Sequence, residues 1–172
     1  DWDGRWVLRG ATVAPVPHRA GGPKLWVGGH APASLERAGR FFDAWFPLAP
    51  DPAGFAAGMA NVRAAAVAAG RAPGAVGGAM YLTVSLHDDP REAERRLDDY
   101  LARYYAPAPT AVMRRVQACY AGDAAGLGSW LGEFVAAGAT HLVLRFVGEH
   151  DRHLEVAAEL RALVTLATEA RA

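Results

Sequence analysis

The sequence predicts an α/β protein built on a parallel sheet, and two observations support this prediction. Short apolar segments of strand-like composition alternate along the chain with longer segments whose apolar residues recur at helical spacing. Asp-Pro pairs follow two of the strand segments, at Asp51 and Asp89, and match a helix start with Asp as the cap and Pro in the first turn. Strands that alternate with helices form parallel sheets with right-handed crossovers.

The composition is typical of a globular domain. The chain has 172 residues, of which 52% are hydrophobic and 21% are charged, and its formal net charge is zero. A neutral chain has no overall attraction for nucleic acid or an anionic membrane, and no apolar run is long enough to span a bilayer. The single cysteine, Cys119, excludes an intrachain disulfide and is typical of a reducing compartment. We therefore expect a cytoplasmic protein that binds neither nucleic acid nor a membrane, and we expect no metal site.

The first part of the chain predicts a connector followed by one strand and one helix. Residues 1–22 contain Gly and Pro in turn-forming positions, so we expect them to lead into the first strand. Residues 24–28 form a short apolar strand that stops at Gly28-Gly29. Pro32 is suited to a first helical position, and apolar residues follow it at helical spacing.

The middle of the chain repeats this pattern. Residues 44–48 form the next short strand, and a helix capped by Asp51 continues to Gly70, a natural stop. Residues 77–87 form the clearest strand, because apolar and polar side chains alternate along it. Asp89 then caps another helix.

The last part of the chain predicts more helix and a final strand. After a Pro-rich break, a second helical stretch is expected over residues 110–120, with Cys119 packed on it. Residues 122–128 are expected to be a loop, and a helix follows. Residues 140–147 form the last strand, and Asp151 is expected to cap the final helix.

The alternation in the strands predicts which side chains face the covering helices. Because helices cover one face of such a sheet, that face must be apolar. The opposite, inward face then carries polar side chains at the carboxyl ends of the strands, where barrel enzymes keep their chemistry. The inward residues are Tyr81, Thr83, Ser85 and His87 of one strand and His141, Val143 and Arg145 of the last.

The segment from Pro23 to Pro47, PKLWVGGHAPASLERAGRFFDAWFP, resembles the luciferase-like monooxygenase family. In that family a Pro-(apolar)-Gly-Gly-x-(Ser/Ala)-Pro segment precedes a helix that ends in an Ala-Asp-Gly-Trp type of strand, and Ala44 stands where the family usually has Gly. The turn Gly70-Arg71-Ala72-Pro73 and the segment AAGATHLVLRF are also similar to family motifs. The resemblance covers nearly the whole chain and rests on the order and spacing of these motifs.

The resemblance implies a partial TIM barrel. The family fold is a (β/α)8 barrel roughly twice as long as this chain, and the match begins near its fifth strand. Residues 1–172 are therefore expected to form a single partial domain, equivalent to strands 5–8, from a half or truncated barrel. Such a sheet leaves open edges and an uncovered inward face. We expect a homodimer, or a complementary half-barrel, to complete it.

The Gly28-Gly29-His30 turn is the first candidate for cofactor binding. Glycine lets backbone N–H groups approach an anion, and the following helix start adds a favourable dipole. The resemblance implies that this loop binds the phosphate of FMN or coenzyme F420, with His30 and Ser34 as further hydrogen-bond donors. From the residues alone, a tight strand-to-helix turn explains the same pattern.

Three inward residues are further candidates. Arg145, near the end of the last strand, is suited to pair with a phosphate or a carboxylate substrate, or with a neighbouring Asp or Glu. His87 is a candidate acid or base, or a plain loop residue, and Ser85 lies where it could contact a cofactor or simply begin a loop. We expect all three side chains to open onto the same mouth as the Gly-Gly turn.

The resemblance implies an oxidoreductase with a small-molecule substrate. Reduced FMN would activate oxygen, or reduced F420 would transfer a hydride, while the protein binds and orients the reactants. The alternative is a non-catalytic flavin-binding or assembly module that has lost the substrate half of the barrel. A third reading is an excised half of a normal enzyme.

Overall fold

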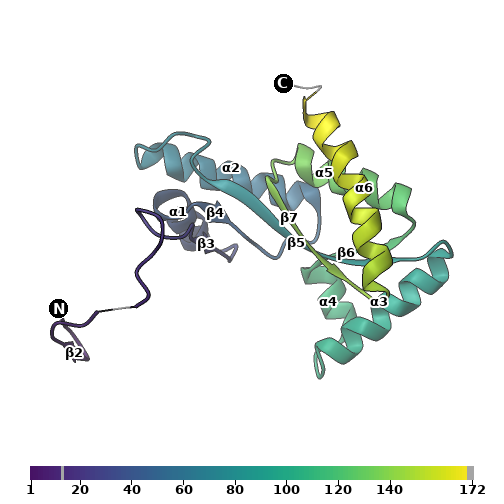
Figure 1. Ribbon diagram of the computed structural model, residues 1–172, viewed down its shortest axis with the longest axis horizontal. Coiled ribbons are helices and arrows are strands. Elements are labelled where there is room, and N and C mark those ends of the chain that lie inside the picture. Colours follow the sequence, from purple (N-terminus) through teal and green to yellow (C-terminus); the bar gives the residue numbers. More distant parts are fainter. Residues whose placement is uncertain (13, 170–172) are drawn as a thin grey trace.

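A parallel sheet with helices on both faces forms the centre of the molecule (Figure 1). The structure is a computed structural model that describes residues 1–12 and 14–169, with side chains described up to residue 161. The order in the sheet is β3-β4-β5-β6, and β7 also pairs with β5. The strands are β3 (Trp26–Val27), β4 (Ala44–Trp45), β5 (Gly77–Leu86), β6 (Ala118–Gly122) and β7 (His141–Phe146).

The long strand β5 holds the sheet together. The backbone N–H and C=O groups of one strand residue point to one edge, and those of the next residue point to the other edge. Residues an even number of positions apart therefore bond to the same edge. The Gly77 N–H donates to Asp43 O, and the His87 N–H donates to Gly122 O, so β4 and β6 share one edge of β5. The parallel strand β7 pairs with residues 79–84 along the other edge. Within the described residues, the outer edge of β7 pairs with no strand.

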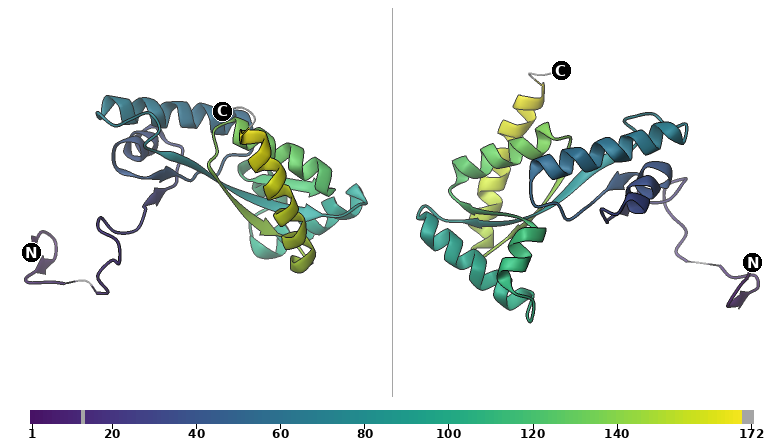
Figure 2. Two further views of the ribbon diagram at one scale, coloured as in Figure 1. Left: turned by 45° about the horizontal axis from the view of Figure 1, so that its top comes forward. Right: turned by 180° about the vertical axis from the view of Figure 1, so that it is seen from behind.

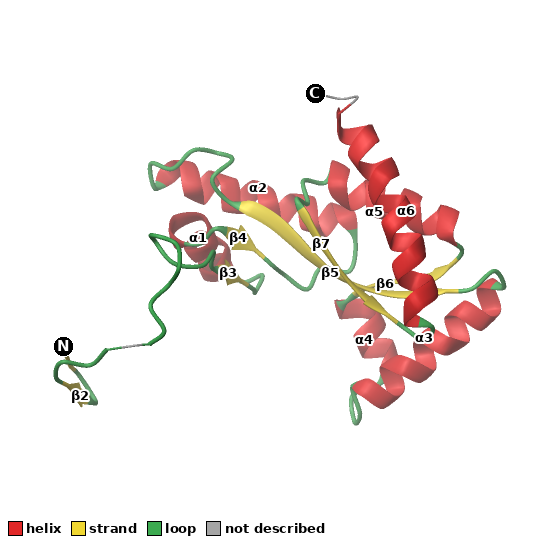
Figure 3. Ribbon diagram, in the orientation of Figure 1, coloured by secondary structure: helices red, strands yellow, loops and turns green. Residues whose placement is uncertain are grey.

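One face of the sheet is covered by α2 (Pro52–Ala68), α5 (Ala124–Ala136) and α6 (His150–Glu169), and α1 (Pro32–Phe41) packs on α2 (Figure 3). The apolar side chains of β5 and β7 meet these helices, as the alternation in the sequence predicts. The largest fully buried side chains of this core are Phe55, Phe134, Met59, Met80, Leu82 and Leu127.

The opposite face is covered in part by α3 (Pro90–Tyr104) and α4 (Thr110–Val116) (Figure 2). Leu97 and Leu101, one helical turn apart on α3, are fully buried and form a second cluster with Val147. Cys119 and Ala121 of β6 pack against this cluster. The expectation of an uncovered inward face is therefore wrong for the carboxyl half of the sheet, because the amphipathic α3 folds back over it.

The expected helix over residues 110–120 and the expected loop over residues 122–128 are both wrong in part. Strand β6 occupies residues 118–122, and helix α5 begins at Ala124. Helix α4 ends at Val116, and Gln117 has extended backbone angles of φ −117° and ψ 146°. The apolar run that follows satisfies helical and strand patterns alike, and pairing with the edge of β5 selects the strand. Cys119 therefore lies on a strand, and burial raises the pKa of its thiol.

The expected helix starts are confirmed for α2 and α3. The Asp51 side chain accepts a hydrogen bond from the Gly54 N–H, and Asp89 accepts one from the Arg91 N–H. The last helix differs, because α6 begins at His150 and Asp151 lies in its first turn rather than at the cap. None of the helices in the described part of the chain is both long and apolar enough to cross a membrane.

The N-terminal segment lies apart from the sheet (Figure 1). It contains a short antiparallel hairpin of β1 (Trp2–Asp3) and β2 (Val7–Leu8). Both strands are exposed, as is Trp6 between them.

Candidate functional site

The turn after β3 has a backbone that favours glycine. Gly29 has φ of +95°, in the region that side chains disfavour, and a Cβ there would lie 2.9 Å from Ser34 Oγ. The buried Trp45 of β4 donates its indole N–H to Gly29 O at 2.7 Å. The neighbouring strand thereby holds the turn in place.

The start of α1, like that of α4, has no side-chain cap, whereas α2, α3 and α5 have one. Carboxylates of Asp51, Asp89 and Asp123 cap α2, α3 and α5. The residue at the cap of α1 is Ala31, whose side chain provides no acceptor. Within the described chain, no residue accepts a hydrogen bond from the N–H groups of residues 28–31. Free N–H groups at a helix start suit an anion.

A cavity of about 650 Å³ adjoins this turn. Arg115, from the end of α4, lines it together with His30, and neither side chain has a hydrogen-bond or ionic partner in the described part of the protein. Gly58 of α2 leaves room for the indole ring of Trp45, because a Cβ at residue 58 would lie 2.1 Å from Trp45 Cη2. The lining residues are His30, Leu35, Trp45, Pro47, Leu48, Ala49, Pro50, Gly54, Gly58, Asn61, Arg115 and Val116.

Arg115 and Asn61 are residues of this cavity that the sequence analysis missed. Arg115 is one of two arginines in the last turn of α4, where a basic residue is explained by the helix dipole. Only the fold places it near the Gly-Gly turn, which lies more than eighty residues earlier in the chain.

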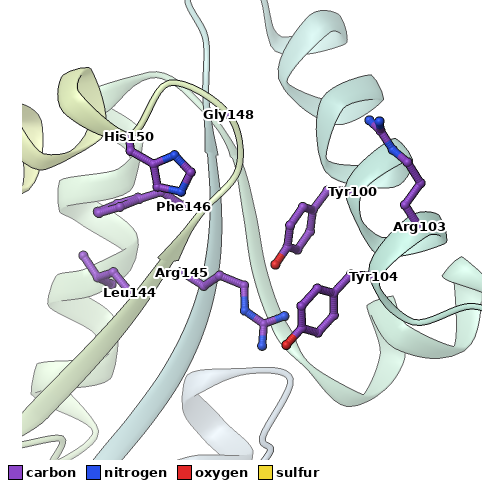
Figure 4. Close-up of a pocket in the computed structure, with 8 residues that line it drawn as sticks. All are labelled: Tyr100, Arg103, Tyr104, Leu144, Arg145, Phe146, Gly148 and His150. Atoms are coloured by element: carbon purple, nitrogen blue, oxygen red, sulfur yellow. The ribbon is translucent and has the colours of Figure 1, made fainter.

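Arg145 lies on the inward face, as predicted, and is surrounded by tyrosines. Its Nη1 donates to the Tyr105 hydroxyl at 2.9 Å, and its guanidinium lies 4.5 Å from the Tyr81 ring centre and 4.4 Å from that of Tyr104. Among the described residues no Asp or Glu forms an ion pair with it. A second cavity, of about 670 Å³, opens beside Arg145 (Figure 4).

The expected common mouth is divided in the structure. Ser85 and Thr83 are fully buried on the inward face, and their hydroxyls have no hydrogen-bond partner in the part of the chain that the structure describes. His87 accepts a hydrogen bond from the Asp89 N–H through Nδ1 at 3.0 Å, next to the start of α3. Neither Ser85 nor His87 lines either cavity, and the two cavities share no lining residue. His30 and Arg145 therefore belong to separate sites.

His153 has a structural role. It is buried, its Nε2 accepts a hydrogen bond from the Leu86 N–H, and its Nδ1 lies 2.5 Å from Glu149 O. Burial lowers the pKa of this imidazole, so the neutral form joins α6 to the end of β5. Among the residues that the structure describes, no three His, Cys, Asp or Glu side chains are grouped to hold a metal ion.

Curated relatives match part of the chain. A phthiodiolone/phenolphthiodiolone dimycocerosates ketoreductase from Mycobacterium sp. (strain JLS) is 34% identical over 99 residues, which cover 57% of this chain and 26% of the relative. The protein of the same description from Mycobacterium kansasii is 31% identical over 100 residues, covering 58% of this chain and 27% of the relative. The match thus spans about a quarter of the relatives' length.

Solved structures share the fold at low sequence identity. An F420-dependent secondary alcohol dehydrogenase in complex with an F420-acetone adduct has a TM-score of 0.66 at 18% identity, covering 80% of this chain and 47% of that one. The coenzyme F420-dependent tetrahydromethanopterin reductase from Methanopyrus kandleri has a TM-score of 0.60 at 16% identity, covering 77% and 48%. The chain thus spans about half of each neighbour and has the fold of a partial barrel.

The family comparison covers almost the entire chain. The model of the family described as luciferase-like monooxygenase matches residues 1–168. The parallel strand–helix order and the shared fold of the solved neighbours agree with this match. The chain belongs to the luciferase-like monooxygenase family.

Proposed function

We propose that this chain is the cofactor-phosphate half of a flavin- or F420-dependent oxidoreductase, with the phosphate bound at the Gly28-Gly29-His30 turn. The observation that carries the proposal is the set of N–H groups at residues 28–31, which have no acceptor among the described residues and lie at the uncapped start of α1. A phosphate would accept hydrogen bonds from these groups and gain from the helix dipole.

The side chains around the turn fit a phosphate group. Arg115 and His30 line the adjoining cavity, and no Asp or Glu lines it. An unpaired guanidinium offers hydrogen bonds and a full positive charge to a phosphate oxygen. The Ser34 hydroxyl, beside Gly29, is a further donor from the first turn of α1.

The chain's own contribution to a reaction would be binding and orientation. FMN or F420, when bound, supplies the hydride-transfer or oxygen chemistry. Trp45 holds the turn in place through Gly29 O, and Gly58 provides the space in which the indole ring packs. The phosphate anchor would then fix where the rest of the cofactor lies. Relatives in the comparisons include F420-dependent enzymes and a riboflavin lyase with modified FMN, which supports either cofactor.

A non-catalytic flavin-binding or assembly module is the second candidate. It is favoured by α3, which covers the carboxyl half of the inward face and buries Ser85. A yellow protein that shows no NADPH- or glucose-6-phosphate-linked reduction would favour this candidate, whereas turnover would favour the enzyme.

The test is a titration of the full chain with FMN and with F420 in separate experiments, followed by cofactor fluorescence. We expect saturable binding of at least one cofactor, weakened about threefold to tenfold by Arg115→Met, which corresponds to at most about 1.4 kcal/mol. Arg91→Met is the matched control, because Arg91 is exposed on α3 and lines neither cavity. Equal losses in both variants, or no binding by the unaltered chain, would contradict the proposal.

A further inference from the structure

We propose that the cavity between α3 and β7 binds the carboxylate of a small organic acid, with Arg145 as the cationic anchor. This site shares no lining residue with the cavity at the Gly-Gly turn. The inference therefore goes beyond the proposed cofactor site and does not depend on it.

The first argument is that Arg145 is a partly buried cation without a counter-ion among the described residues. Its guanidinium lies against the rings of four tyrosines, Tyr81, Tyr100, Tyr104 and Tyr105. Aromatic faces stabilise a cation, but they leave its net charge unbalanced. The hydrogen bond that Nη1 donates to the Tyr105 hydroxyl uses one side of the guanidinium fork.

Neighbouring arginines show that carboxylates are plentiful in this region. Arg95 and Arg96 of α3 both pair with Glu92, and Arg114 of α4 pairs with Glu94 and Asp98. Arg145 packs against the same helix and pairs with none of these acids. Its positive charge is left available on the side of the cavity.

The second argument is the arrangement of the cavity walls (Figure 4). The phenol groups of Tyr100 and Tyr104 point from α3 toward the guanidinium of Arg145, while Arg103 points away from it. Neither of these two hydroxyls has a hydrogen-bond partner in the described chain, so both can donate to an anion. No acidic side chain lines the cavity, whose walls are Tyr100, Arg103, Tyr104, Leu144, Arg145, Phe146, Gly148 and His150.

The chemistry of these walls favours a carboxylate over a phosphate. A guanidinium binds a carboxylate side by side through two N–H groups, and one positive charge balances one negative charge. A phosphate monoester carries up to two negative charges near neutral pH. The Tyr100 and Tyr104 rings, stacked at 5.4 Å, suit the hydrocarbon or aromatic body of such an acid.

The experiment measures the binding of benzoate to the full chain by calorimetry, with benzamide as the neutral analogue and inorganic phosphate as a second anion. We expect benzoate to bind saturably and benzamide and phosphate to bind at least tenfold more weakly. Arg145→Met should remove benzoate binding. Tyr104→Phe deletes one exposed hydroxyl and should weaken binding about threefold to tenfold without unfolding the chain.

Arg91→Met is the matched control, because it removes an exposed arginine of the same helix that does not line the cavity. Unchanged binding in this variant would support the proposal. Three results would overturn it: no benzoate binding, benzoate and benzamide binding alike, or equal losses in Arg91→Met and Arg145→Met. If Arg145→Met fails to fold, unchanged binding in Tyr104→Phe would overturn the proposal by itself.

Discussion

Replacing Trp45 with phenylalanine tests how the Gly-Gly turn is held. Trp45 is 2% exposed, stacks on Phe55 and donates to Gly29 O at 2.7 Å. The variant removes the indole N–H and part of the ring. Leaving a part-buried carbonyl unpaired costs about 1–3 kcal/mol, and the lost packing adds roughly 1–2 kcal/mol. We expect the free energy of unfolding to fall by about 2–5 kcal/mol.

Trp130→Phe is the matched control for the change in packing. Trp130 packs against Tyr120 and Phe134 in the same core, and its indole N–H has no hydrogen-bond partner in the described structure. Urea unfolding followed by circular dichroism gives both free energies without relying on tryptophan fluorescence. We expect Trp45→Phe to cost about 1–2 kcal/mol more than the control. An equal or smaller cost would refute the role of the hydrogen bond in fixing the turn.

Three further predictions concern the rest of the fold. Thr83→Val should raise the free energy of unfolding by about 1 kcal/mol, because the buried hydroxyl has no partner; a clear loss in urea unfolding would show that the hydroxyl is bonded. The pKa of His153 is lowered in the folded chain, so the unfolded chain binds more protons as the pH falls below about 6.5. Stability should therefore be level above pH 7 and decline toward pH 5 in urea titrations, and His153→Gln should flatten this dependence. Sedimentation equilibrium should show a homodimer, since the outer edge of β7 pairs with no strand among the described residues; a stable monomer at micromolar concentration would contradict this.

Much of the fold can be read from local sequence signals. Asp51 and Asp89 mark helix starts through contacts that span only two or three residues. The alternation in residues 77–87 separates the two faces of β5, because the covering helices require an apolar surface. These features depend on neighbours in the sequence, so the sequence alone predicts them.

The features that the sequence does not predict depend on long-range pairing. Strand β6 forms because residues 118–122 meet the edge of β5, whereas its short apolar run fits a helix equally well. Helix α3 covers the inward face through Leu97 and Leu101. In the sequence, these leucines indicate an amphipathic helix but not the surface on which it packs. The same packing buries Ser85 and surrounds Arg145 with tyrosines, and it divides the expected mouth into two cavities.

The binding of FMN and F420 to Gly29→Val is the most direct test of the phosphate site. A valine Cβ would lie 2.9 Å from Ser34 Oγ on a backbone with φ of +95°, so the turn would have to change shape. Gly70→Val is the matched control, since Gly70 also has a positive φ, of +74°, but lies at the far end of α2 with open space around it. We predict that Gly29→Val weakens cofactor binding by more than tenfold, about 1.4 kcal/mol, while Gly70→Val leaves it within twofold. Unchanged affinity in a folded Gly29→Val chain would place the phosphate elsewhere.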